Sequence, residues 1–378
     1  SRFTLDGGLF NCRQHFYVGE QVSSATEPVE IIFKQTGGRL AVGKDSYDMA
    51  NYGSGTPEEG RLIGVYAGTA DMSVEYTMTG GEAVFYRGFS WWNGGTKTIN
   101  LNGGRIDTYG PFNGGSNTLL NWNGTVVAPH ADLNGAPPSN FMRYFTKITT
   151  DTEAVVDMTY CASVDLAAAP SGTGRLVVRG ANTNNVLRLP AQKYNLGGVT
   201  VEKGGMVIPL GASSKDTAPA EILVRDGGGI CDYYGNVIPS LTLGETTSDT
   251  VVLCGYDIRR GISYLKADKL TVNAGKVYVA WRDAVTHKLS LYGGSKEILR
   301  GPKGSIDAAK FAVHPEFAAR GASAQFSVKT DDAYDTLVIN ATAPVSTWTT
   351  EGSGAWADES NWDRVPAGTS YDTVCFPE

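Results

Sequence analysis

A ten-residue pattern with two adjacent glycines at its centre recurs four times near the start of the chain. In each copy, an alternating apolar–polar stretch leads into the glycine pair and a second alternating stretch follows it. Alternation with a period of two places one face of a β-strand against a core, and adjacent glycines allow a sharp bend between two strands. The copies occupy residues 3–12, 33–42, 76–85 and 99–108. The pattern therefore predicts short strands joined at glycine corners.

The spacing of these copies limits how the strands can pack. With a weaker copy around Gly124 included, neighbouring glycine pairs lie 21 to 43 residues apart. A unit of that length cannot bury its apolar face alone, so it must stack on its neighbours. The sequence predicts an all-β solenoid of about a dozen coils, each ~4.8 Å above the last. The longer spacings predict loop insertions at the corners.

Charge and hydropathy exclude two classes of partner. The net charge of −7 and the pI near 5.3 give no basic surface for nucleic acid or an anionic membrane. No apolar run approaches the ~20 residues that a membrane-spanning helix needs.

Ser1 lies directly at the start of an alternating stretch, with no secretory leader before it. We therefore expect the chain to be a portion of a longer precursor.

The sequence divides into three parts. Residues 1–130 carry the glycine-pair repeats, and a Pro-rich interruption follows at residues 134–139. Residues 131–345 repeat the order of strand, glycine corner and strand with less regular spacing, and a short helical turn is expected only within residues 306–320. Residues 346–378 form a Trp-rich extension. We expect two successive solenoid blocks and a C-terminal extension.

Two segments follow recognisable outlines. The first reads GTGRLVVRGANTNN, then LGGVTVEKGGMVIPLG, and its matching positions are Gly174, Leu176, Gly180, Asn182, Thr183, Gly198, Thr200 and Gly205. It resembles the autotransporter-associated β-strand repeat of large Gram-negative surface proteins. It departs from that repeat at residues 185–195, which replace a short link, and at residues 202–203, where Glu-Lys replaces Asn-Ala. The second outline comprises Trp348, Gly352, Gly354, Trp356, Asn361, Trp362, Pro366, Asp372 and Phe376, and it resembles an element that opens a further β-helical block in such proteins.

The resemblance implies a secreted, right-handed parallel β-helix. It further implies a structural or adhesive role on a bacterial cell surface, as a stalk or fibre subunit that contacts copies of itself or further blocks of its own polypeptide through its ends. The Trp-rich extension would either cap the rod or add a strand to a neighbour, and we favour the second. Trp348, Trp356, Trp362 and Phe376 are the candidate assembly residues.

Trp91 and Trp92 are adjacent, beside Tyr86 and Phe89. Adjacent residues of a strand point to opposite faces, so one indole would be buried and the other exposed. An exposed indole can stack on a sugar ring or dock a partner. The alternative, which we favour, is a corner packed against its own loop.

Cys231 and Cys254 are 23 residues apart, which matches the shorter repeat period. On adjacent coils their Cα atoms would lie within the range that a disulfide accepts. We favour a ladder of two small buried side chains over a disulfide, because free cysteine is often simply buried.

The main alternative function is a polysaccharide lyase or hydrolase. Asp257 and Arg259 would share a strand face, and Arg282, Asp283 and His287 would stack beside them one coil later. We favour an exposed ion-pair ladder for these residues. A glycan-binding module without turnover is the second alternative. The sequence contains no zinc-binding spacing of histidines, no nucleophile elbow and no phosphate-binding loop. We expect neither a catalytic constellation nor a metal or cofactor.

Overall fold

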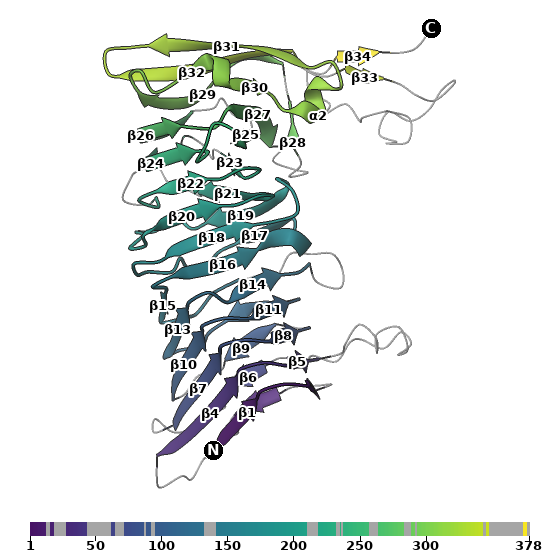
Figure 1. Cartoon of the computed structure of the whole chain (residues 1–378), viewed down its shortest axis with the longest axis vertical. Helices are drawn as coiled ribbons and strands as arrows, with labels where there is room; N and C mark the ends of the chain where they lie inside the picture. Colours follow the sequence, from purple (N-terminus) through teal and green to yellow (C-terminus); the bar gives the residue numbers. More distant parts are fainter. Residues whose placement is uncertain are drawn as a thin grey trace.

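The protein is an elongated stack of β-strands in a computed structural model (Figure 1). Nearly all of its regular structure is β, and the long sheets are largely parallel. The described residues are 1–12, 16–18, 28–43, 62–64, 72–86, 88–91, 95–131, 141–209, 218–231, 235, 237–256, 264–282, 289–291, 293–342, 345–347 and 373–375. The all-β, solenoid-like architecture expected from the repeats is therefore present.

One fourteen-stranded sheet runs the length of the stack and receives one strand from each successive coil. Its neighbours pair in parallel as far as β29, and its last two strands pair antiparallel. In order across the sheet, the strands are β2 (Leu9–Cys12), β5 (Arg39–Val42), β8 (Glu82–Phe85), β11 (Arg105–Thr108), β14 (Val126–Pro129), β16 (Glu153–Asp157), β18 (Arg175–Arg179), β20 (Gly198–Val201), β22 (Ile222–Val224), β24 (Val237–Leu243), β26 (Leu265–Val272), β29 (Gly294–Pro302), β32 (Tyr334–Thr342) and β31 (Ser323–Thr330).

Three further sheets form the other faces of the coils. A six-stranded parallel sheet contains β1 (Arg2–Leu5), β4 (Val29–Gln35), β7 (Met72–Met78), β10 (Thr96–Leu101), β13 (Thr118–Trp122) and β15 (Lys147–Thr149). A four-stranded parallel sheet contains β3 (Phe16–Val18), β6 (Leu62–Gly64), β9 (Phe89–Trp91) and β12 (Phe112–Asn113). The eight-stranded sheet contains β17 (Ser163–Asp165), β19 (Asn185–Leu189), β21 (Gly205–Pro209), β23 (Gly229–Cys231), β25 (Thr250–Tyr256), β27 (Lys276–Arg282), β28 (Leu289–Ser290) and β30 (Phe311–Val313). The inserted link at residues 185–195 thus supplies strand β19.

The glycine pairs lie one above another at the corner between the six- and fourteen-stranded sheets. Gly38, Gly81 and Gly104 have φ of +65°, +80° and +82°, in the left-handed region that favours glycine. A Cβ on Gly104 would lie 2.6 Å from the carbonyl oxygen of Gly81, and a Cβ on Gly81 would overlap the carbonyl of Gly38. The corners therefore require glycine both for conformation and for the close approach of neighbouring coils.

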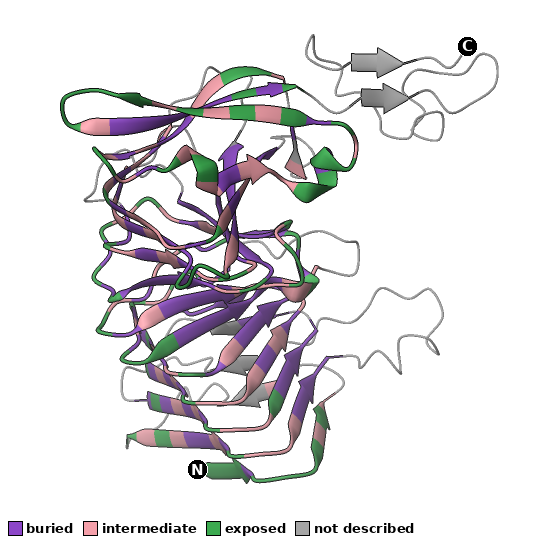
Figure 2. Cartoon of the chain, turned by 45° about the horizontal axis from the view of Figure 1, so that its top comes forward, coloured by how far each residue is buried: buried purple, intermediate pink, exposed green. Residues whose placement is uncertain are grey.

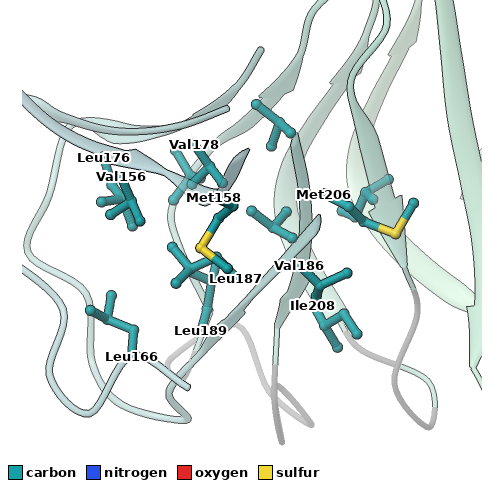
Figure 3. Packing of buried hydrophobic residues seen from close by; sticks show 14 of the residues in the cluster. Val156, Met158, Leu166, Leu176, Val178, Val186, Leu187, Leu189, Met206 and Ile208 are labelled. Carbon is teal, nitrogen blue, oxygen red and sulfur yellow. The ribbon is translucent and has the colours of Figure 1, made fainter. Parts of the chain in front are cut away.

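The core is the continuous interior of the stack, along which buried residues recur from coil to coil (Figure 2). Their side chains form one apolar cluster. Ile99 and Leu101 of β10 are fully buried above Tyr76 and Met78 of β7, their register partners. Figure 3 shows the same packing near β16 and β18, where Val156 and Leu176 belong to one apolar cluster. Each fully buried residue of this kind contributes roughly 1.5–3 kcal/mol.

A polar ladder follows the outer face of the six-stranded sheet. The Asn100 amide donates to the Thr77 hydroxyl at 3.1 Å, and the Asn121 amide donates to the Asn100 amide oxygen at 2.8 Å. The Thr149 hydroxyl continues the chain to Asn121 at 2.7 Å. These side chains occupy one register position on successive coils, so the ladder is satisfied only when the coils pair in this register.

The C-terminal end of the stack is covered by a lid that was not predicted from the sequence. Strand β32 pairs antiparallel with β29, and β31 pairs antiparallel with β32. Strand β31 also packs against β30 and the 3-10 turn η4 (Ala308–Lys310). The short helix α2 (Pro315–Ala318) follows β30. Both turns lie within residues 306–320, which confirms the predicted position of a helical turn. A further 3-10 turn, η1 (Met158–Tyr160), was not predicted.

The boundary predicted at residue 130 does not interrupt the stack, because β14 pairs with β16 across it. Beyond the lid, β33 (Val345–Thr347) pairs in parallel with β34 (Thr373–Cys375). Most of the Trp-rich extension at 346–378 lies outside the described residues, and its role as a cap or a donated strand stays a prediction.

Replacing Gly81 with alanine should destabilise the protein far more than replacing Gly8. Both residues have positive φ, which costs a Cβ-bearing residue roughly 1–2 kcal/mol. A Cβ on Gly8 meets nothing within 4 Å, whereas one on Gly81 overlaps the backbone of the coil beside it. We expect Gly81→Ala to lower the free energy of unfolding by about 3 kcal/mol or more in chemical denaturation. Equal losses for the two variants would contradict the stacked-corner geometry.

Candidate functional site

The aromatic residues singled out in the sequence are mostly beyond what the structure describes. Trp91 is the last residue of β9, and its side chain is not described. Trp92, Trp348, Trp356, Trp362 and Phe376 lie outside the described residues. The proposals for an exposed indole and for Trp-mediated assembly therefore stay predictions.

Cys231 and Cys254 are brought together as the repeat period implied. They are register partners on β23 and β25, and both side chains are buried. Both residues belong to the apolar core, as the favoured ladder of two small buried side chains requires. A disulfide at this position stays a prediction.

Arg282 does not lie in the exposed ion-pair ladder that the sequence predicted. Its side chain is buried, and its guanidinium donates to the backbone carbonyls of Thr183 at 3.3 Å and Asn184 at 2.9 Å. Arg282 therefore ties β27 to the turn before β19. Asp257, Arg259, Asp283 and His287 lie outside the described residues, so the constellation proposed around them is untested.

The structure assembles a different cluster, at the corner that follows the strands of the fourteen-stranded sheet. Four rings stack there along the axis, each from a successive coil. Ring centroids are 5.3 Å apart between Tyr86 and Tyr109, and 4.3 Å apart both between Tyr109 and His130 and between His130 and Tyr160. The exposed fraction rises from 8% at Tyr86 to 54% at Tyr160. We call these four residues the ring column.

Strand register positions the ring column. Tyr86, Tyr109 and His130 each follow the last residue of their strand, at β8, β11 and β14. Their N–H groups donate to the preceding coil at 2.8–3.0 Å, which holds them in line. Tyr160 reaches the same line from the end of η1. None of the four was a predicted site residue, although the sequence carries a signal for three of them: Tyr86, Tyr109 and His130 repeat at the 23- and 21-residue spacings of the glycine pairs.

A charged network lies beside the ring column and extends over four successive coils, from β11 to β18. Arg105 donates to Asp107 on its own strand at 3.0 Å and to Asp157, two coils away, at 2.8 Å. The strand between them places Ala128 next to Asp107, and the small side chain leaves room for the guanidinium to pass. Arg179 lies 3.7 Å from Asp157 on the far side. We call these four charged residues the Arg–Asp network.

His130 joins the two groups. Its Nε2 lies 2.8 Å from Asp107 Oδ1, and its ring is sandwiched between Tyr109 and Tyr160. Burial alone would raise the pKa of the Asp107 carboxyl, but hydrogen bonds from His130 and Arg105 hold that pKa below its usual value. Burial likewise opposes ionisation of Asp157, and hydrogen bonds from Thr159 and Arg105 hold its pKa low. The cluster is an internally paired surface in which Asp107 and Asp157 are held as carboxylates, with one exposed ring at Tyr160.

Lys97 is a second unusual group, because it points into the core. It lies in β10 two residues before Ile99, on the inward face of the strand, and is fully buried. Removal from water disfavours the ammonium form and lowers the pKa of Lys97 to about 8. The alternation of residues 97, 99 and 101 already implied this inward position in the sequence.

Comparisons with protein-family models, curated proteins and solved structures find no match for this chain. Across the described ranges, no three acidic, histidine or cysteine side chains converge in a way that would hold a metal ion. Within the same ranges, no helix has the length and apolar character needed to cross a bilayer.

Replacing Arg105 with methionine should destabilise the fold and change its response to acid. The substitution leaves Asp107 and Asp157 without their shared cation, at a cost of about 2 kcal/mol at neutral pH. Both carboxyls have lowered pKa values in the folded state, so their stabilisation is present above pH ~4 and lost as pH falls below it. The stability of Arg105→Met, measured by denaturation from pH 7 to pH 3, should therefore fall less steeply than that of the wild type. Lys329→Met, which breaks an exposed pair with Glu297, is the control and should cost almost nothing.

Lys97 should make stability rise with pH in the alkaline range. The pKa of Lys97 is about 8 in the folded protein against 10.5 when unperturbed, so the unfolded state binds more protons between these values. Unfolding free energy should therefore increase from pH 8 to pH 10.5, by roughly 2–3 kcal/mol from this group. In Lys97→Met the increase should disappear relative to the wild type. Parallel pH profiles for the two proteins would contradict the buried position of the amine.

Proposed function

We propose that this chain is a right-handed parallel β-helix that serves as a stalk or fibre unit on a bacterial cell surface. It associates through its N-terminal end with further coils of the same kind, in a second copy or in another block of its polypeptide. The observation that carries the proposal is the contrast between an open, aromatic N-terminal end and a covered C-terminal end. The handedness and the cell-surface location rest on the resemblance of residues 172–211 and 346–378 to autotransporter repeats.

The N-terminal end exposes a cross-section of the core. Phe3, Phe10 and Phe16 come from β1, β2 and β3, and their ring centroids lie 5.2–6.4 Å apart in a triangle. Phe3 is 40% exposed, whereas its register partner Phe33 is 1% exposed in the next coil. Apolar aromatic clusters of this kind are the usual anchors of protein interfaces.

The same end presents unpaired strand edges among the described residues. The carbonyls of Leu5 and Cys12 accept hydrogen bonds from the second coil. Because alternate residues of a strand direct their backbone groups to opposite sides, Thr4 and Asn11 direct theirs away from that coil. A strand added at this end could form both apolar contacts with the aromatic rings and hydrogen bonds with the outward backbone groups.

Among the described residues, the other end does not show this combination. The lid of β31 and β32 lies over the stack, and Phe326 on β31 packs 6.3 Å from Phe311 on β30. Phe311 and Phe317 are buried there. This covering supports association through the N-terminal end.

Light scattering and electron microscopy of the purified chain test the proposal. We expect concentration-dependent pairs joined at one end of the rod. Thr4→Pro removes an outward N–H and Phe3→Glu places a charge on the aromatic triangle, so each should weaken pairing at least about tenfold. Leu119→Glu is the matched control, since Leu119 is 38% exposed on the side of the stack, and should not affect pairing.

A chain that stays monomeric at every concentration, or pairs equally well in all three variants, would overturn the proposal. Thermal unfolding of each variant checks that the stack itself is intact. Cleavage of a polysaccharide by the wild type would favour the enzymatic alternative instead.

A further inference from the structure

The ring column ends in an aromatic platform at Tyr160. His130 covers one face of the Tyr160 ring, with an interplanar angle of 11°. Tyr160 is nevertheless 54% exposed. Because one face is covered, that exposure belongs to the opposite face and to the rim of the ring. The open face is directed along the axis, away from His130.

The next coil leaves this position unfilled by a ring. After the register pair Asp157–Arg179, the next coil continues through Gly180, Ala181 and Asn182, whereas its predecessor turns through η1 and ends that turn at Tyr160. Asn182 and its neighbour Ala181 are small and exposed. Gly180 packs closely against the following coil, where a Cβ would lie 2.7 Å from the carbonyl oxygen of Gly204. Among the described residues, no further ring stacks on Tyr160, so the column ends at its exposed face and a planar group can add there.

The rim of the platform is polar. The Arg105 guanidinium carbon lies 5.8 Å from the Tyr160 ring centroid. Arg105 and Arg179 approach the same oxygen of Asp157, at 2.8 and 3.7 Å. The other exposed large apolar side chains of the described chain, such as Leu9 and Leu119, lie on different strands. A protein partner would need an apolar surround that excludes water, and this rim does not provide one.

We propose that Tyr160 is a saccharide-binding platform that stacks on one pyranose ring of a polysaccharide. A pyranose has an apolar C–H face for the aromatic ring and a periphery of hydroxyls for the charged groups of the neighbouring Arg–Asp network, in which the Arg179 side chain is 40% exposed. Stacking on His130, with Tyr109 beneath, holds the platform in place before binding, so little side-chain entropy is lost. This site is separate from the N-terminal end, and binding here does not depend on whether that end associates.

Affinity electrophoresis of the full chain through gels containing dextran, galactomannan, polygalacturonate or alginate tests the platform. We expect at least one polysaccharide to retard the wild type and Tyr160→Ala to weaken that binding about five- to tenfold. Tyr144→Ala is the matched control. Tyr144 is 60% exposed but stands outside the ring column, so its loss should leave binding unchanged.

Substitutions of His130 test whether saccharide binding requires a ring stacked beneath Tyr160. His130→Phe keeps a ring beneath Tyr160 and should bind within about threefold of the wild type, whereas His130→Ala removes the support and should bind several-fold more weakly. Thermal unfolding checks that each variant is folded. The proposal is overturned if none of the four polysaccharides retards the wild type, if Tyr144→Ala weakens binding as much as Tyr160→Ala, or if the two His130 variants bind alike. The proposal is also overturned if all four polysaccharides retard the wild type and Tyr160→Ala to the same extent.

Discussion

Parallel backbone pairing between strands one coil apart is the interaction on which the rest of this structure depends. It sets a fixed rise between equivalent residues, so side chains at one sequence position become columns along the axis. The apolar columns form the core, the Asn100–Asn121 column forms an outer ladder, and the ring column forms a corner. Each column in turn is satisfied only in one register, so the side chains reinforce the pairing that aligns them.

The glycine corners are the local feature that makes this pairing continuous. A left-handed φ turns the chain from one face to the next, and the missing Cβ lets neighbouring corners approach closely. Both properties are visible in sequence as adjacent glycines between alternating stretches, which is why the all-β, solenoid-like architecture could be predicted. The helical turn within residues 306–320 was also predictable, because Pro315 interrupts the alternation there and fits the start of a helix.

The lid and the candidate site were harder to foresee, for two physical reasons. An antiparallel strand alternates like a parallel one, so residues 323–330 looked like another coil although β31 returns on β32. Arg105 and Asp157 are 52 residues apart, and their contact requires both the register and the small side chain of Ala128. The ring column was different, because its spacing was readable beside that of the glycine pairs. The stacking of His130 on Tyr160 could not be predicted, because it depends on how the coils place the two rings face to face.

The two ends of the rod have different physical characters, and this difference connects the fold to the proposed role. The lid covers the apolar interior at the C-terminal end, whereas the aromatic triangle leaves it open at the N-terminal end. A rod of this kind can join a neighbour at one end and keep its sides available for other contacts, such as the exposed ring of Tyr160. Both surfaces are built by the same stacking of coils.

Cysteine cross-linking across neighbouring coils tests the stacked register most directly. Asn100 and Asn121 are register partners, so Asn100→Cys combined with Asn121→Cys should form a disulfide under mild oxidation, detected by peptide mass mapping. Asn100→Cys combined with Asn123→Cys, two residues out of register, should not. Efficient cross-linking of the second pair, or none of the first, would contradict the parallel in-register stack.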